Sequence, residues 1–245
     1  MTGQVWRDRA RFGDLRAVLD PADERGYKNY YIDLIHRAAL DRHFAAKADD
    51  VVLDFGCGLG RLSRWLSKRA RLVIGLDLVA EMLTVAHQQN REDNLYWVCY
   101  DGHGLPLGDE SVDRIVSVGV LQHILGQEAL QATISEFKRV MKPGGKIYVI
   151  EQVQYRRPCI IKDYVEQRLI DEYQREFQAA GYAHLHTVQV RAPSLLTSLA
   201  GTGLIPRAAL GWLARLDTKL LPLRRPGCTY ADYLSIFEKV GRTCY

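Results

Sequence analysis

The chain has 245 residues, of which 47% are hydrophobic and 25% charged, a composition typical of a globular protein with a sizeable core. Its 33 Lys and Arg and 29 Asp and Glu residues give a formal net charge of +4, an excess too small to indicate a nucleic-acid partner. The excess is local. Residues 191–228 carry six basic residues and one acid, Asp217, and sum to +5, which leaves the rest of the chain at −1.

Neither end of the sequence indicates export or a membrane span. The first residues lack the basic-then-apolar pattern of a secretory signal, and the longest uncharged stretch of the tail, 192–206, is short and interrupted by Pro and Gly. The five cysteines contain no Cys-x-x-Cys pair, which argues against a disulfide framework or a zinc knuckle. They are Cys57, Cys99, Cys159, Cys228 and Cys244. We expect a cytoplasmic protein with reduced thiols and no metal.

Short apolar runs alternate with helical stretches through the middle of the chain, which is typical of βαβ units and a parallel sheet. In chain order we expect helical residues 1–48, strand 51–55, helix 61–68, strand 72–76, helix 80–90, strands 95–100 and 112–118, helix 128–141, a break at 142–145, strand 146–152, helix 160–180 and strands 184–190 and 233–240. The last two strands would pair antiparallel, with residues 193–229 inserted between them.

A glycine loop joins the first predicted strand to the first helix of this unit. The sequence Asp54-Phe-Gly-Cys-Gly-Leu-Gly60 lets a ligand approach the backbone, and the helix that follows offers unpaired N–H groups. A dinucleotide fingerprint has the spacing Gly-x-Gly-x-x-Gly, but Arg61 stands where its last glycine would be. No Gly-Lys-Ser/Thr follows, so a Walker loop is excluded.

Two further acids follow the next two strands. Asp77 ends the second strand, where a carboxylate can accept both hydroxyls of a ribose and would disfavour a 2′-phosphate. Asp101 follows the third strand, at an edge where it could accept from the amino group of an adenine. Acids at successive strand ends predict a nucleoside-binding edge, because ligands of open α/β sheets bind at the carboxyl ends of the strands.

With these motifs, residues 51–152 resemble a class I S-adenosylmethionine-dependent methyltransferase of the ubiquinone and small-molecule type. The resemblance rests on Val51–Gly60, Gly75-Leu-Asp-Leu78, Asp101-Gly-His-Gly-Leu-Pro106 and Phe137–Gly145, about two-fifths of the chain. It implies S-adenosyl-L-methionine as cofactor. It also implies the cofactor-binding residues Asp54, Gly56, Cys57, Gly58, Gly60, Asp77, Leu78, Met82, Asp101, Gly102, His103, Val118 and Leu121.

The fold expected is α/β and Rossmann-like: a doubly wound seven-stranded sheet, mostly parallel with an antiparallel last strand, as the family implies. We expect one methyltransferase domain over residues 1–245. Residues 1–48 would form a helical N-terminal cap, residues 49–153 the cofactor-binding core, and residues 154–245 a C-terminal half with an acceptor-side insertion at 191–228.

His123, in the loop after the fourth strand, is the candidate catalytic base. In the resembling family this loop edges the methyl group, and a base helps to deprotonate a hydroxyl acceptor. A structural role, in which the imidazole bonds to a neighbouring backbone, is the alternative. The family also suggests that Tyr27, Tyr30 and Tyr31 form a lid, the alternative being a helix face packed on the sheet.

Three other features have weaker functional interpretations. Glu151 and Gln152 end the fifth strand, where substrate residues often lie. His184 and His186 would share one strand face, as some metal ligands do, but no third ligand is evident. The basic and apolar insertion could be a cap, a substrate lid that reaches an anionic group, or a membrane-contacting segment, the last of which is not favoured.

The sequence therefore predicts a methyltransferase that acts on a small-molecule or glycan- or lipid-linked acceptor, with oxygen as the favoured acceptor atom. An anionic acceptor would suit the insertion, and the sequence does not fix the oligomeric state. A catalytically silent S-adenosylmethionine-binding scaffold is the alternative, and a nicotinamide oxidoreductase is a less favoured one. A nucleic-acid methyltransferase is not indicated, because Ser117-Val-Gly-Val120 stands where an Asn-Pro-Pro-Tyr-like motif would be.

Overall fold

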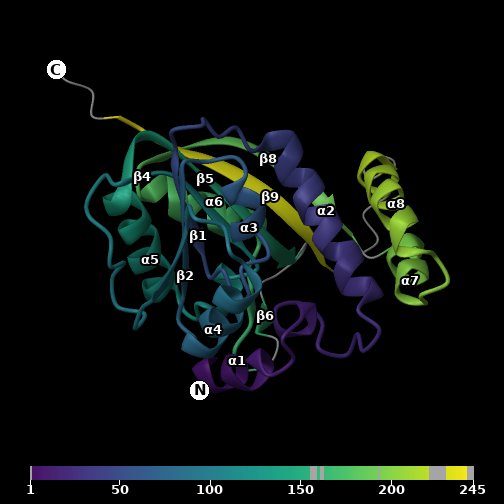
Figure 1. The fold of residues 1–245 in the computed structure, drawn as a ribbon. Helices are drawn as coiled ribbons and strands as arrows, with labels where there is room; N and C mark the ends of the chain where they lie inside the picture. Colours follow the sequence, from purple (N-terminus) through teal and green to yellow (C-terminus); the bar gives the residue numbers. More distant parts are fainter. Residues whose placement is uncertain (1, 155–158, 161–162, 193, 221–229, 242–245) are drawn as a thin grey trace.

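The computed structural model describes residues 2–154, 159–160, 163–192, 194–220 and 230–241. Its centre is a seven-stranded sheet with the order β3-β2-β1-β4-β5-β9-β8 (Figure 1). The strands are β1 (Val51–Phe55), β2 (Leu72–Asp77), β3 (Leu95–Cys99), β4 (Val112–Val118), β5 (Met141–Gln154), β8 (Tyr182–Arg191) and β9 (Tyr230–Lys239). Strands β1 to β5 pair in parallel, whereas β9 pairs antiparallel with both β5 and β8. The predicted Rossmann-like sheet with an antiparallel last strand is confirmed.

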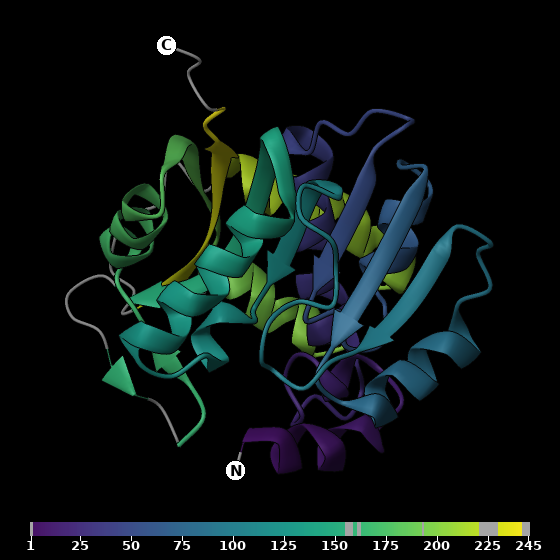
Figure 2. The same cartoon turned by 90° about the vertical axis from the view of Figure 1, so that its left-hand side faces the viewer.

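Helices cover both faces of the sheet, as Figure 2 shows from the side. They are α1 (Thr2–Ala10), α2 (Tyr27–His43), α3 (Ser63–Ser67), α4 (Ala80–Gln89), α5 (Gln127–Val140), α6 (Ile170–Ala179), α7 (Leu195–Gly201) and α8 (Arg207–Leu220), with short 3₁₀ turns η1 (Leu15–Ala17) and η2 (Leu121–His123). A small hairpin pairs β6 (Cys159–Ile160) with β7 (Glu166–Gln167).

The sheet separates two apolar cores, because successive side chains of a strand point to opposite faces. Val52 of β1 belongs to the core beneath α2, α3 and α8, whereas its neighbours Val51 and Leu53 belong to the core beneath α5 and α6. The strands at the centre are therefore apolar on both sides, as expected for a parallel sheet covered by helices. This packing fixes the strand ends at which the site lies.

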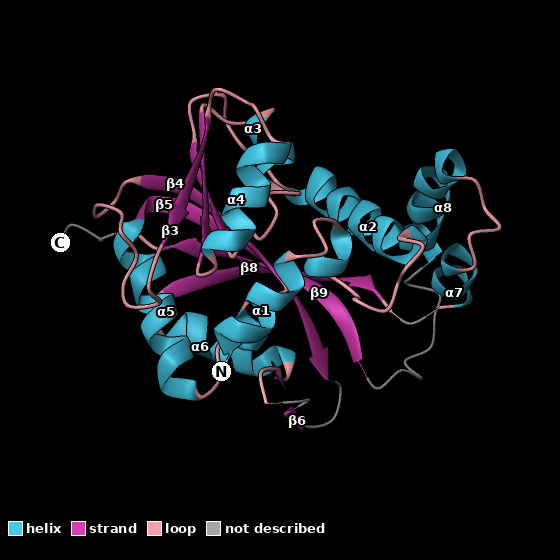
Figure 3. Ribbon diagram, turned by 60° about the horizontal axis from the view of Figure 1, so that its bottom comes forward, coloured by secondary structure: helices cyan, strands magenta, loops and turns pink. Residues whose placement is uncertain are grey.

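The N-terminal region packs on the rest of the sheet in two parts (Figure 3). Helix α1 lies beside α4, and Ala10 of α1 shares a small core with Val79 and Met82. Helix α2 packs on the sheet and also contacts α7 and α8, which lie beyond it at one end of the molecule. None of the described helices is long and apolar enough to span a membrane.

Two element boundaries differ from the prediction. The helix expected over 160–180 begins only at Ile170, because Glu166, Gln167 and Leu169 before it take part in β pairing. Arg168 is 4% exposed and donates to the carbonyl oxygens of Leu121 and Ile124, at 3.2 and 2.8 Å. Residues 161–162 of that stretch lie outside the described residues.

The break expected at 142–145 lies inside a strand. Met141 of β5 already pairs with Val112, and the ladder then shifts register before Lys146 pairs with Arg114. A Cβ on Gly145 would lie 2.9 Å from the Lys142 carbonyl oxygen and 3.0 Å from that of Asp113. The helix therefore ends just before the Lys-Pro-Gly-Gly segment, as predicted. The segment itself forms an irregularity within β5.

Candidate functional site

The glycine loop lies between β1 and α3, at the carboxyl end of the sheet. Gly56, Gly58 and Gly60 have φ values of 69°, 54° and 74°, a left-handed backbone that glycine adopts without strain. Space is restricted as well, since a Cβ on Gly58 would lie 2.6 Å from the Cγ1 of Val18. The loop therefore requires glycine for its conformation and for the close approach of the N-terminal segment.

Asp77 holds this loop from the end of β2. Its Oδ2 accepts from the N–H of Gly58 at 2.8 Å, and its Oδ1 accepts from the N–H of Val79 at 3.0 Å. Each carboxylate oxygen has a second lone pair, so the group can still accept hydroxyl hydrogens. Burial raises the pKa of Asp77, whereas the backbone N–H groups act in the opposite direction.

A cavity, which we call the glycine-loop cavity, opens beside Gly56, Gly58 and Asp77. Its other lining residues are Gly3, Trp6, Val18, Phe55, Leu78, Val79, Met82, Tyr100, Val118, Gly119, Val120, His123 and Ile124. The wall thus combines an exposed backbone and a carboxylate with apolar side chains, which suits a nucleoside with its sugar on the carboxylate and its base on the apolar side. Of the predicted residues, Leu78, Met82 and Val118 also meet here.

Four other predicted residues lie behind this cavity and do not line it. Asp54, Cys57, Gly60 and Leu121 are buried. Ser63 donates to Asp54 Oδ2 at 2.5 Å, yet burial raises the pKa of Asp54 to about 6. These residues shape the loop from the inside.

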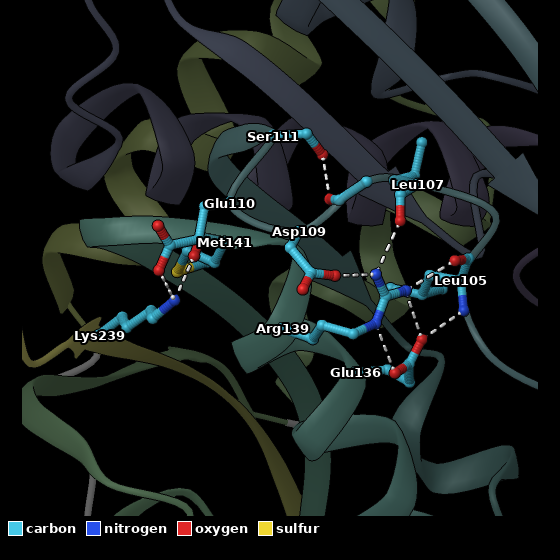
Figure 4. A network of polar contacts seen from close by, with 10 residues as sticks. Leu105, Leu107, Asp109, Glu110, Ser111, Glu136, Arg139, Met141 and Lys239 are labelled. Atoms are coloured by element: carbon cyan, nitrogen blue, oxygen red, sulfur yellow. Dashed lines mark hydrogen bonds and ion pairs between the residues drawn. The ribbon is translucent and has the colours of Figure 1, made fainter.

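Asp101, Gly102 and His103 lie in an exposed loop at the end of β3, beside the glycine-loop cavity residue Tyr100. Asp101 Oδ1 accepts from the backbone N–H of His103 at 2.8 Å. The following segment is tied to α5, as Figure 4 shows: Arg139 donates to the carbonyl oxygens of Leu105 and Leu107, each at 2.8 Å. The segment that follows Asp101 is therefore held in place by Arg139, whereas the Asp101 side chain is exposed to solvent.

A second cavity of about 500 Å³, which we call the large cavity, adjoins the first. The two share Trp6, Val18, Val118, Gly119 and His123. The large cavity is further lined by the N-terminal segment, the ends of β5, β8 and β9, and the start of α7. These residues include Arg9, Asp20, Lys28, His36, Arg61, Gln122, Glu151, Gln152, Tyr164, Gln167, Arg191, Ser194, Thr197, Tyr230 and Asp232.

A buried network of charges forms one wall of the large cavity. Arg191 Nε donates to Asp232 Oδ2 at 2.7 Å, and His36 Nε2 lies 3.2 Å from the same oxygen. Burial opposes ionisation of Asp232, but Arg191 and then His36 lower its pKa to about 2. Arg61 donates to Asp33 Oδ1 at 2.7 Å and lies 3.4 Å from His36 Nδ1. The wall is therefore polar and held in a fixed arrangement.

His123 lies where the two cavities meet, and its Nδ1 is 2.8 Å from the carbonyl oxygen of Tyr164. A carbonyl oxygen only accepts, so Nδ1 carries the proton and Nε2 keeps its lone pair in the neutral ring. Burial lowers the pKa of His123, with the Tyr164 carbonyl acting in the opposite direction. Trp6 packs edge-on against the imidazole, with ring centroids 4.8 Å apart.

Glu151 holds the turn that carries His123. It is 3% exposed, and its carboxylate accepts from the backbone N–H groups of Val120, Leu121 and Gln122 at 2.9, 2.7 and 3.2 Å. Burial raises the pKa of Glu151 to about 7, although these three N–H groups act in the opposite direction. The Glu151 side chain thus fixes the backbone immediately before His123.

The tyrosines expected as a lid pack within the protein. Tyr31 is fully buried, and its hydroxyl donates to Asp217 Oδ2 of α8 at 2.7 Å. Tyr27 and Tyr30 pack against the same core, with the Arg207 guanidinium over both rings. None of the three lines either cavity, and Trp6 of α1 covers this region instead. In the sequence, the signal for this cover is the presence of Trp6 and Arg9 in the first helical segment.

His184 and His186 do not share a strand face. A register shift in β8 pairs His184 with Phe237 and His186 with Ile236, which are neighbours on β9 and so point to opposite faces. His184 Nε2 lies 2.7 Å from Thr187 Oγ1, and His186 packs against the ring of His43. The alternation of the sequence could not reveal this bulge. Among the described residues no group of three potential metal ligands occurs.

The comparisons with known proteins agree with this geometry. Residues 53–149 match a family described as "Methyltransferase domain". The chain is 32% identical over 122 residues to a demethylmenaquinone methyltransferase of Tropheryma whipplei (strain Twist), covering 49% of each chain. It is 42% identical over 97 residues to a malonyl-[acyl-carrier protein] O-methyltransferase of Yersinia pestis, covering 40% of this chain and 34% of that protein. It therefore spans half the length of these curated relatives or less.

Among solved structures, the [4+2]-cyclase SpnF shares the fold, with a TM-score of 0.65 and 20% identity, covering 85% of this chain and 82% of that one. The sheet order, the glycine loop and the acid that ends β2 define a Rossmann-like nucleotide-binding fold. The matched part of the chain, residues 53–149, is a methyltransferase domain of the class I S-adenosylmethionine-dependent family, and it forms the centre of this sheet.

Proposed function

We propose that this protein transfers a methyl group from S-adenosylmethionine to an oxygen atom of an acceptor that occupies the large cavity. The acceptor would be a small molecule or a glycan- or lipid-linked one. The observation that carries the proposal is that the glycine-loop cavity and the large cavity share a wall at Trp6, Val18, Val118, Gly119 and His123. A methyl donor in one cavity and an acceptor in the other would meet there, and such positioning supplies much of the rate of a transfer reaction.

In this proposal the glycine-loop cavity holds the cofactor, which supplies a methyl group activated on a sulfonium. Backbone at Gly56 and Gly58 would contact the amino-acid part, Asp77 would accept the ribose hydroxyls, and Leu78 and Met82 would flank the adenine. Asp101, Gly102 and His103 would lie at the adenine edge, with Val118 beside the methyl side. Asp54, Cys57, Gly60 and Leu121 would support the loops from inside.

His123 would be the base that removes the proton of the acceptor hydroxyl. Three features support this role: its position between the two cavities, the Nδ1–H···O bond to Tyr164 that leaves Nε2 as an acceptor, and burial that keeps the ring neutral. The bond to Tyr164 is also the backbone contact expected of a structural histidine, so the catalytic and structural roles are compatible. Glu151 would act through His123 as a positioning residue.

The walls of the large cavity support a polar acceptor. Three of its cations are engaged by carboxylates: Arg191 by Asp232, Arg61 by Asp33, and Lys28 by Asp20 at 2.6 Å. The fourth, Arg9, donates to the backbone carbonyl oxygens of Arg16 and Leu19. Amide and hydroxyl groups fill much of the remaining wall, which suits hydroxyl and carbonyl groups of an acceptor. An oxygen acceptor also agrees with the name of the Yersinia pestis relative, a malonyl-[acyl-carrier protein] O-methyltransferase. We propose that the N-terminal cap, the core and the insertion act as one unit, since each contributes to this cavity.

The test is a methylation screen with product detection by mass spectrometry, across hydroxylated metabolites and glycan- and lipid-linked acceptors. Asp77→Ala is the control variant, which we expect to lose cofactor binding. Calorimetry with S-adenosylmethionine accompanies each assay. Binding without any methylated product would favour the scaffold. Absence of binding, together with binding of a nicotinamide cofactor, would favour the oxidoreductase. The likeness to a cyclase makes product detection necessary, because a shared fold does not fix the reaction.

A further inference from the structure

Helix α8 has a buried face and, on its opposite side, a row of exposed side chains. Its buried residues Leu210, Leu213 and Ala214 face α2 and the core. On the opposite side, Trp212, Arg215 and Lys219 are exposed and follow one another at the helical spacings of three and four residues. Trp212 is 68% exposed, so the helix presents a large aromatic ring beside two cations.

Helix α7 and the link to α8 add leucines to this exposed region. Leu195 is 88% exposed, Leu199 42% and Leu204 81%. Together with Trp212 they account for four of the ten large apolar side chains exposed among the described residues, within 18 residues of chain. Such a concentration marks an interaction surface more often than scattered exposed leucines do.

The same region has cations but no exposed acid among its described residues. Its single acid, Asp217, is 3% exposed, where Tyr31 donates to it and Ser194 Oγ lies 3.4 Å away. Arg207, Arg215 and Lys219 are exposed. Within residues 194–220 the excess of positive charge is therefore presented to solvent with no exposed carboxylate in the same segment.

We propose that the outer face of α7 and α8 docks on an anionic phospholipid surface. Leu195, Leu199, Leu204 and Trp212 would enter the headgroup region, and Arg215 and Lys219 would meet the lipid phosphates. A basic amphipathic helix with Trp and Leu lies in such an interface through apolar burial and electrostatic attraction together, and each basic residue near the surface raises the affinity about fivefold. A purely ionic partner, such as a nucleic acid, leaves the exposed leucines without a role.

The inner side of α7 faces the large cavity, to which it contributes Thr197 and Ser198. Docking would therefore bring the wall of that cavity close to the lipid surface, from which a lipid-linked acceptor could enter. This last step rests on the proposed function, whereas docking itself does not.

The experiment is vesicle flotation of the full chain, with phosphatidylcholine vesicles and with phosphatidylcholine vesicles that contain phosphatidylglycerol. We expect flotation with the anionic vesicles alone, weakening as salt is raised. Arg215→Glu with Lys219→Glu should reduce the bound fraction more than about tenfold, and Leu204→Ser with Trp212→Ser should reduce it at every salt concentration. Lys68→Glu with Arg91→Glu is the control, because it changes the charge equally at exposed positions outside the insertion.

Circular dichroism and calorimetry with S-adenosylmethionine establish that each variant is folded. The proposal is overturned if the chain fails to float, if the control pair lowers binding as much as the insertion pair, or if the chain binds an oligonucleotide and not the vesicles. Loss of flotation in folded variants that still bind the cofactor leaves the proposed function intact, so the two proposals are distinguished.

Discussion

At the scale of single residues, the protonation state of His123 decides whether it can act as a base. Burial lowers its pKa below the usual 6.5, so the neutral ring persists to a lower pH than in water. Protonation of His123 should therefore lower the activity, kcat/KM, only below about pH 6.5. We expect His123→Gln to lower kcat by about 10² to 10⁴ and to remove the acidic limb of the pH profile.

Cofactor affinity provides the control for His123. The side chain of the glutamine variant keeps a group that can donate to the Tyr164 carbonyl, so S-adenosylmethionine affinity measured by calorimetry should change little. Full turnover in this variant, with an unchanged pH profile, would assign His123 to structure alone.

Glu151 links pH to stability. Its pKa is raised by burial from 4.5 to about 7, so the native state binds a proton more tightly than the unfolded state. The resulting contribution to stability is present below about pH 4.5 and is lost as pH rises through 7. The resulting change in the free energy of unfolding across this pH range is on the order of 3 kcal/mol. Urea unfolding of the Glu151→Gln variant between pH 4.5 and 7 should lack this decline relative to the wild type.

The exposed Glu128 gives a comparison for Glu151. Glu128→Gln removes one carboxylate at an exposed position and is the control for the substitution itself. If the Glu151→Gln variant declined as steeply as the wild type, the decline would have to come from other groups. Asp54 is one such group, since its pKa is also raised, to about 6.

At the scale of elements, the bond from Tyr31 of α2 to Asp217 of α8 attaches the insertion to the core. Tyr31→Phe removes one donor to a buried carboxylate, which costs about 1–3 kcal/mol. We expect a lower free energy of unfolding and faster proteolysis within residues 194–220. Tyr27→Phe is the control, since the half-buried Tyr27 ring keeps its contact with Arg207. Equal proteolysis of both variants would contradict the role of Asp217.

The elements that could be predicted were those set by periodicity and turn chemistry. The parallel strands, the glycine loop and the acid at Asp77 follow from local signals. The late start of α6 depends on the contacts of Arg168 with the turn after β4, and the His184/His186 bulge depends on pairing with β9. Both are contacts between segments distant in sequence, which a local pattern does not encode.

The same distinction applies within the site. Each acid of the cofactor edge follows a strand and could be found from spacing. The wall of the large cavity joins His36 of α2, Arg191 of β8 and Asp232 of β9. No motif connects these three positions, because only the order of the sheet brings β8 and β9 beside the helix that precedes β1. The sequence pointed to Glu151, Gln152 and the insertion, which do line this cavity, but it could not bring His36 and Asp232 to the same wall.

At the scale of the whole molecule, the first helix contributes to both cavities. Trp6 lines both, packs against His123 and lies near Arg9, whose guanidinium is 4.7 Å from its ring centroid. A ligand in the glycine-loop cavity would contact α1 directly and so stabilise it against local opening. Because α7 and α8 pack mainly on α2, the same ligand should leave them unaffected.

Limited trypsin digestion measures this difference, since α1 and the residue after it carry Arg7, Arg9 and Arg11, and α8 carries the exposed Arg215 and Lys219. We expect S-adenosylhomocysteine to slow cleavage in α1 several-fold and to leave cleavage in α8 unchanged. Trp6→Ala should abolish the protection, because the contact that transmits ligand binding to α1 is lost. Equal protection of both helices would mean that the ligand stabilises the fold globally, and the coupling assigned to α1 would then be wrong.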